Sequence, residues 1–157
     1  MAGIQLSTAG VKLYYAVEES LGTRPTEGWK EITEIKTIPE LNPEPDNLET
    51  TTLAETEWRT FIPGLKDPGG ALSFTANLTE VSMTEWEEVV EAYETGASTN
   101  LATWFVIVIP GLTKSLYFTG QPSPMGMPSI EVSAVLETNL YITPTGAPAW
   151  DTKPTIV

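Results

Sequence analysis

Apolar and polar side chains alternate along much of this chain, and a period of two is typical of strands with one buried face. The clearest alternation covers residues 11–18, 72–78 and 129–143. Residues 102–109 are apolar at nearly every position, which indicates a strand covered on both faces, and residues 114–119 are expected to return beside it as a hairpin partner. The pattern therefore predicts a mainly antiparallel β protein.

Other segments are less regular. The apolar residues of segment 29–38 are spaced by three, and we interpret this segment as a bulged strand. Residues 58–62 predict a short strand ended by Pro63-Gly64, and residues 67–70 (DPGG) predict a turn. Residues 120–128 (GQPSPMGMP) predict a loop.

One helix is predicted after residue 81. Ser82 and Glu85 have the spacing of a capping box, and Gly96 is a suitable stop. Five apolar residues at helical spacing form a stripe that we expect in the core: Met83, Trp86, Val89, Val90 and Tyr93. The glutamates between them are expected to face solvent.

A long polar excursion interrupts the strands at residues 39–57. Its first part, residues 39–46 (PELNPEPD), holds three prolines, which exclude a central strand or a helix. Such an excursion is rare in a compact domain unless it is functional or disordered. Two interpretations remain open: a floppy surface loop, or an arm that becomes ordered against another subunit. The candidate inter-subunit residues are Pro39, Leu41, Asn42, Pro43, Pro45, Asn47, Leu48, Thr50 and Thr52.

The last alternating segment, residues 129–143, is unusually long. Its fifteen residues would span roughly 50 Å as one strand, about twice the ordinary length. It is either one long strand that serves a larger assembly or two strands joined by a bend near residues 137–139. Its polar face carries Ser129, Glu131, Ser133, Glu137 and Asn139. We expect one β-sandwich or barrel domain with one packed helix over residues 1–145, and a loose Pro-rich tail over residues 146–157.

Composition narrows the chemistry. The 157 residues carry 8 Lys+Arg against 21 Asp+Glu, a net charge of −13, with no His and no Cys. Disulfides, thiolate nucleophiles, Cys-based zinc sites and His general bases are thereby excluded. The negative charge disfavours tight binding to nucleic acid or to an anionic membrane surface. No signal peptide or apolar run of membrane-spanning length stands out, so no membrane anchor is expected.

No catalytic constellation emerges from the sequence. The acid pairs Glu18-Glu19, Glu55/Glu57 and Glu87-Glu88 have no specificity in so acidic a chain. Residues 46–49 lack the spacing of a calcium loop, and no glycine-rich segment has the Lys-Ser/Thr of a phosphate loop. We expect a protein that is not an enzyme and needs no cofactor.

The order of these features resembles the major tail tube proteins of long, non-contractile phage tails, the siphophage tail tube family. The resemblance covers residues 11–145 and rests on the succession of several segments rather than on one motif. They are Leu13-Tyr14-Tyr15, Trp29-Lys30-Glu31-Ile32, the excursion closing on Trp58, residues 68–74 (PGGALSF), the helix with Trp86, Thr103-Trp104-Phe105, the Gly120 loop and the long last strand.

The resemblance implies a β-sandwich that forms hexameric rings, which stack into a tube for DNA passage during ejection. It implies that the excursion reaches neighbouring subunits or the next ring, and that the partners are tape measure, tail terminator and tail-tip proteins. The protein would be made in the host bacterial cytoplasm and end in the virion tail. An acidic channel would let DNA pass without tight binding, and we hypothesise that Glu131 and Glu137 face this lumen. Two alternatives stay open: an injection-tube protein of a secretion system, and an acidic β-sandwich binding or adhesion module.

Overall fold

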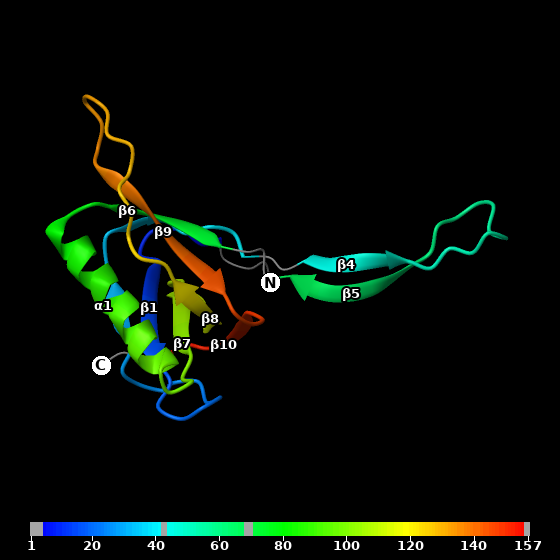
Figure 1. Cartoon of the computed structure of the whole chain (residues 1–157), viewed down its shortest axis with the longest axis horizontal. Helices are drawn as coiled ribbons and strands as arrows, with labels where there is room; N and C mark the ends of the chain where they lie inside the picture. Colours follow the sequence, from blue (N-terminus) through cyan, green and yellow to red (C-terminus); the bar gives the residue numbers. More distant parts are fainter. Residues whose placement is uncertain (1–4, 42–43, 68–70, 156–157) are drawn as a thin grey trace.

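A β-rich body with one helix carries a projecting two-stranded ribbon (Figure 1). The computed structural model describes residues 5–41, 44–67 and 71–155. The elements are β1 (Lys12–Val17), β2 (Lys30–Ile32), β3 (Ile35–Thr37), β4 (Glu44–Glu49), β5 (Phe61–Asp67), β6 (Leu72–Asn77), α1 (Glu80–Ala97), β7 (Thr103–Val108), β8 (Lys114–Pro122), β9 (Glu137–Pro144) and β10 (Ala149–Thr152).

The body sheet is antiparallel and nearly closes on itself. Its strand order is β2-β1-β7-β8-β9-β6-β3, with β10 paired to β8. The two end strands, β2 and β3, are joined by Thr33 and Glu34, and Glu34 has a φ of 65°. Segment 29–38 is therefore not one bulged strand but two strands separated by a corner, because β2 pairs with β1 whereas β3 pairs with β6.

The main core fills the inside of this curled sheet. It holds the inward residues of the alternating strands together with Trp86 and Val89 of α1. The buried members are Leu13, Tyr15, Ile32, Leu72, Phe74, Ala76, Trp86, Val89, Phe105, Ile107, Phe118, Leu140 and Ile142. A second cluster, Tyr14, Ala16, Trp29, Val106 and Tyr117, lies on the other face of β1, β7 and β8. The prediction of a mainly β fold with one packed helix is confirmed, and β7 is buried on both faces as expected.

The helix begins earlier than the sequence predicts. Thr79 is the N-cap: its side chain accepts the Ser82 N–H at 3.1 Å, and the Ser82 hydroxyl accepts the Thr79 N–H at 2.9 Å. The predicted capping box of Ser82 with Glu85 is wrong, since Ser82 already lies in the first turn. Gly96 lies in the last turn, one residue before the helix ends at Ala97.

The predicted core stripe is correct for part of its length. Trp86 and Val89 are buried, and Val90 and Tyr93 are half-buried. Met83 is 42% exposed, so its assignment to the core is wrong. It lies instead in a groove between the first turns of α1 and the loop after β8.

Strand β8 bends so that it serves two parts of the sheet. Its first part pairs with β7 and β10, and its last residues pair with β9. At Gly120 an added Cβ would lie 2.5 Å from Cγ2 of Ile142, so the packed Ile142 side chain leaves no room for a side chain at this position. The predicted loop 120–128 therefore begins later, because Gly120, Gln121 and Pro122 still belong to β8.

The predicted long strand is wrong at its beginning. Residues 130–136 lie outside regular strands, and β9 starts at Glu137. The predicted loose tail is wrong for residues 149–152, because β10 continues antiparallel along the edge of β8. Asp151 forms an ion pair with Arg24 at 2.7 Å, and the Tyr117 hydroxyl donates to the Thr152 carbonyl at 2.6 Å. Within the described residues, no helix has the length and apolar character needed to cross a membrane.

Candidate assembly surfaces

The excursion of the sequence is a β-hairpin, which we call the arm (residues 44–67). Its strands β4 and β5 pair antiparallel with each other, with Asn47 opposite Pro63 and Glu49 opposite Phe61. The prediction that Pro63-Gly64 ends a strand is wrong, because β5 continues to Asp67. A two-stranded ribbon keeps an outer edge free on each strand, so a proline without an N–H is tolerated there. The described part of the excursion has strand pairing, and Figure 1 shows it pointing away from the body.

The predicted inter-subunit residues fall into three groups. Pro45, Asn47 and Leu48 lie on β4, and Thr50 and Thr52 lie in the tip, so these five belong to the arm. Pro39 and Leu41 lie at its base, where Leu41 packs against the main core. Leu41 is only partly buried, so its predicted role in a subunit contact stays a prediction. Asn42 and Pro43 lie outside the described residues.

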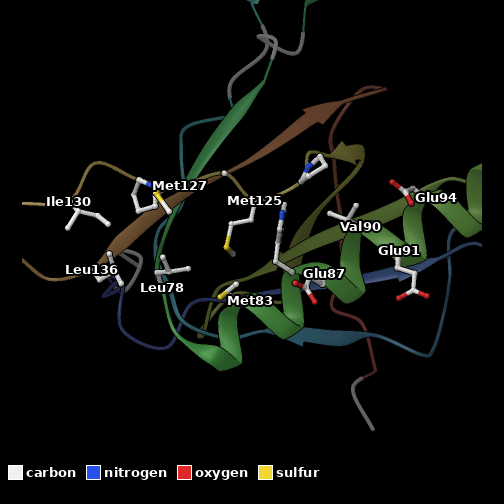
Figure 2. Close-up of a pocket in the computed structure, with 14 residues that line it drawn as sticks. Leu78, Met83, Glu87, Val90, Glu91, Glu94, Met125, Met127, Ile130 and Leu136 are labelled. Atoms are coloured by element: carbon white, nitrogen blue, oxygen red, sulfur yellow. The ribbon is translucent and has the colours of Figure 1, made fainter.

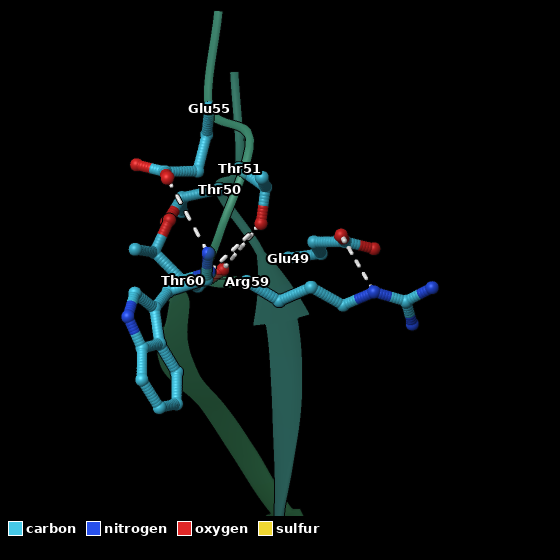
Figure 3. A network of polar contacts seen from close by, with 7 residues as sticks. Glu49, Thr50, Thr51, Glu55, Arg59 and Thr60 are labelled. Atoms are coloured by element: carbon cyan, nitrogen blue, oxygen red, sulfur yellow. Dashed lines mark hydrogen bonds and ion pairs between the residues drawn. The ribbon is translucent and has the colours of Figure 1, made fainter. Parts of the chain in front are cut away.

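Hydrogen bonds define the conformation of the arm tip (Figure 3). The Thr50 N–H donates to the Thr60 carbonyl, and the Thr60 N–H donates to the Thr51 hydroxyl, both at 2.8 Å. The Glu55 carboxylate accepts the backbone N–H groups of Thr56, Glu57 and Trp58 at 3.1, 3.0 and 3.3 Å. These backbone donors, those of Glu57 and Trp58 first, hold the pKa of Glu55 below its ordinary value. The tip is thus shaped by its own polar groups.

Large apolar side chains stand exposed on this arm. Leu53 is fully exposed and Trp58 is 76% exposed at the tip, while Leu48, Phe61 and Ile62 are each about half exposed on the strands. Contiguous exposed apolar surface marks interaction sites in soluble proteins. The candidate list from sequence missed Leu53, Trp58, Phe61 and Ile62. Their signal was present as isolated large apolar residues within a Thr- and Glu-rich stretch.

A second projection is the loop between β8 and β9, residues 123–136. Both of its ends are fixed: the Ser123 carbonyl accepts the Trp86 indole N–H at 2.8 Å, and the Leu136 carbonyl accepts the Leu78 N–H at 2.9 Å. Between these points the apolar side chains of the loop are largely exposed: Met127, Ile130, Val132, Val135 and Leu136. The alternation that predicted a strand here therefore has no buried face within the subunit.

A groove of about 760 Å³ separates this loop from α1 (Figure 2). Its apolar lining includes Met83, Met125 and Met127, with Trp86 and Val90 from the helix. Glu87, Glu91 and Glu94 follow one another along the helical wall. The groove therefore combines an apolar floor with a negative wall.

The residues predicted to face a lumen divide between two places. Glu137 and Asn139 lie on the outward face of β9, opposite Asn77 and Thr75 of β6. Ser129, Glu131 and Ser133 lie in the exposed loop instead, so these five residues do not share one strand face. Glu137 is paired with Lys36 of β3. The outward face of β9, β6 and β3 is therefore hydroxyl- and amide-rich, with one compensated charge pair.

The carboxylates of the described residues are spread over several elements. Within the described residues, no three His, Cys, Asp or Glu side chains are placed to hold a metal ion. Glu18 is buried and accepts the Ala102 N–H and the Trp104 indole N–H, each at 2.9 Å, so it joins the β1 end to the β7 start. Glu18 thus stabilises the fold by fixing the end of β1 to the beginning of its neighbour β7.

Comparison with known proteins finds a similar fold but no similar sequence. No protein-family model matches the chain, and no curated protein matches it. Among solved structures, it is similar to a chain of the anti-feeding prophage (AFP) baseplate, determined by cryo-EM and six-fold symmetrised. The match has a TM-score of 0.69 at 11% sequence identity and covers 97% of this chain and 98% of that one. The two chains share their fold from end to end.

Proposed function

We propose that this chain is a structural subunit of a phage tail or tail-like particle, forming hexameric rings that stack into a tube. The observation that carries the proposal is the arm: an ordered ribbon that leaves the body and displays large apolar side chains, Trp58 and Leu53 above all. The end-to-end likeness to a chain of the AFP baseplate, itself six-fold symmetrised, supports the same class of assembly.

The arm is poorly explained by the needs of a monomer. Its two strands pair with each other and with no other strand of the described chain, and an isolated two-stranded hairpin is marginally stable in water. The six residues of β4 alone span roughly 20 Å at about 3.3 Å per residue. An arm of that reach gains apolar burial when it lies on another subunit, and its two open edges offer backbone groups for further pairing.

A tube role would also explain the polar outward face of β9, β6 and β3 as the lining of a channel. This face, with Asn139, Thr75 and Ser73, is the best candidate for the wall of a channel, because it is largely polar apart from the partly exposed Tyr141, and its Lys36 is paired with Glu137 rather than free to hold phosphate. DNA would pass without tight binding, and tape measure, terminator and tail-tip proteins would be the further partners. The role is structural and requires no catalytic group or cofactor, and its place is the virion tail.

Electron microscopy of the purified protein at rising concentration tests this proposal. We expect rings or tubes from the intact chain, and a folded monomer when residues 46–64 are replaced by a short Gly/Ser linker. Circular dichroism and thermal melting of the deletion variant check that the body remains folded. Tubes of normal length from this variant would show that the arm is not needed for assembly. A monodisperse monomer from the intact chain at all concentrations would overturn the proposal.

The two alternatives make different demands. An injection-tube protein shares the ring and the arm and differs in what passes through the channel, so DNA release from whole particles separates it from a phage tail tube. A carbohydrate-binding module requires exposed aromatic platforms. Trp29 and Trp86 are buried, and the exposed Trp58 and Trp150 lie on different elements, the arm tip and β10. Binding on a glycan array by a chain that forms no rings would favour that module.

A further inference from the structure

We propose that the arm tip of one copy docks into the groove between α1 and residues 123–136 of a second copy. Trp58 would enter the apolar floor, and Arg59 would face Glu87, Glu91 and Glu94. The inference rests on the proposed self-assembly and names the two surfaces that meet. It pairs an exposed aromatic side chain at the arm tip with an open groove on the body, neither of which has a partner within the described part of the subunit.

The groove suits an aromatic side chain. Its volume of about 760 Å³ exceeds what one indole needs, and three of its lining residues are methionines: Met83, Met125 and Met127. Methionine adapts its shape, and its sulfur makes favourable contacts with aromatic rings. Met83 and Met127 are 42% and 86% exposed in the free subunit, so an inserted ring would remove apolar surface from water on both partners.

The arm tip suits a groove with a negative wall. Arg59 is next to Trp58 in the chain, its side chain is 78% exposed, and its Nε is 4.0 Å from the nearest oxygen of Glu49, a loose pair that leaves the guanidinium accessible. Glu55 is turned into the tip by its backbone bonds, so its carboxylate already has partners. Glu57 and Glu49 also lie on the tip side of the arm and oppose the contact in part, which makes Arg59 the residue on which charge complementarity depends. Trp and Arg dominate the strongest contacts of known interfaces.

The contact must join different copies. Figure 1 shows the arm and α1 on opposite sides of the body, so the tip of one copy points away from its own groove. A knob and a groove on different parts of one chain make a head-to-tail contact, which closes into a ring or continues as a filament according to its rotation. Both outcomes are compatible with rings that stack.

The absence of native cysteine allows a direct test by pairwise cross-linking. One preparation carries Leu53→Cys at the tip, and a second carries Met127→Cys at the groove. Mixed under mild oxidation, the two should yield a disulfide-linked heterodimer, whereas Leu53→Cys mixed with Leu21→Cys, an equally exposed position on the body, should not. Equal yields in both mixtures, or no product in either, would overturn the docking.

A charge exchange provides an independent arm of the experiment. Trp58→Ala should weaken association of subunits at least about thirty-fold, as for an interface hot spot, measured by sedimentation velocity. Arg59→Glu should also weaken it, and adding Glu87→Arg and Glu91→Arg to the same chain should restore it. If Arg59→Glu weakens association and the groove substitutions do not restore it, the groove is not the partner of Arg59. If tubes form but the tip-to-groove cross-link does not, the proposed function stands and this inference fails. If the cross-link forms but no rings or tubes appear, the docking stands and the proposed function fails.

Discussion

Glu85 on α1 accepts hydrogen bonds from both the backbone N–H and the hydroxyl of Thr33, the first residue of the corner between β2 and β3. The N–H bond is 2.7 Å long. At this corner the chain passes from β2, the strand at one end of the sheet, to β3, the strand at the other end, and Glu34 adopts a positive φ. One helical carboxylate thus fixes the point at which the sheet closes, and this contact ties residues 52 positions apart.

Replacing Glu85 should therefore destabilise the whole body. In Glu85→Gln the amide oxygen can still accept the Thr33 N–H and the Thr33 hydroxyl can accept from the amide, but both bonds lose the charge of the carboxylate, so we expect a loss of about 1–3 kcal/mol in the free energy of unfolding. Chemical denaturation measures this loss. Glu87→Gln, at an exposed position of the same helix, is the matched control and should change stability by less than about 0.5 kcal/mol. Equal stability of the two variants would contradict the role of Glu85.

Trp86→Phe tests the anchor of the second projection. The substitution retains an aromatic ring in the core but removes the indole N–H that binds the Ser123 carbonyl. We expect a loss of about 1 kcal/mol from the hydrogen bond, with a further loss from the smaller ring. Amide exchange should rise most near Ser123. Trp150→Phe, at an exposed tryptophan, controls for the loss of an indole, and a uniform rise in exchange across the sheet would argue against a local anchor.

Gly120→Ala tests the close approach of β8 and β9. The new methyl group would lie 2.5 Å from Cγ2 of Ile142, so the buried Ile142 side chain or the strand that carries it must shift, at a cost of about 1–3 kcal/mol. Gly126→Ala, in the loop where a Cβ meets nothing within 4 Å, should be nearly neutral. Thermal melting compares the two variants, and a Gly120→Ala protein as stable as the wild type would show that the bend of β8 does not depend on this contact.

Acid should loosen the arm tip. Because backbone donors hold the pKa of Glu55 below its ordinary value of 4.5, its contribution to tip order is fully present above that value. It is lost as the pH falls through the lowered pKa of the folded tip. The protection factors of the amide protons of Glu57 and Trp58, measured by NMR relative to the intrinsic exchange rate at each pH, should fall over that interval. Glu55→Gln should remove this pH dependence, and a tip that stays protected in acid would contradict it.

The candidate channel wall is open to a charge test in assembled particles. The sequence hypothesis joined Glu131 and Glu137, but Glu131 lies in the exposed loop and Glu137 is paired with Lys36. Asn139→Lys is the cleaner change, because Asn139 is exposed on the outward face of β9. We expect DNA ejection to slow, since a new cation in the channel would hold phosphate. Glu131→Lys is the comparison, and equal ejection kinetics for Asn139→Lys and wild-type particles would move the lumen elsewhere.

Alternation predicted the body well because most strands there have one buried face. It located β1, β6 and β7 to within about a residue or two, and the helical stripe located α1 through Trp86 and Val89. The same signal failed at residues 129–136, where apolar residues alternate without any cover inside the subunit. Periodicity reports that a face is apolar and not whether anything covers it, so an exposed apolar segment looks like a core strand.

The arm was harder to predict for a different reason. Three prolines and many acids argue against a strand in a sheet interior, and this argument is sound for central strands. It does not apply to β4 and β5, where Pro45 and Pro63 lie in a ribbon with open edges. The corner at Thr33 and the contact with Glu85 depend on residues far apart in the chain, which local patterns do not report.

Trp58 and Leu53 are exposed at the end of a ribbon that projects from the body, where another molecule can reach them. The net charge of −13 on each chain acts against encounters between subunits, but electrostatic repulsion extends only about 10 Å at 0.1 M salt and less at higher ionic strength. Electrostatic repulsion therefore determines how readily two subunits approach each other, whereas burial of apolar side chains determines how strongly they bind once in contact. If the subunits assemble as proposed, they would stay apart at low salt, and added salt would lower the barrier to their association without any change in the fold.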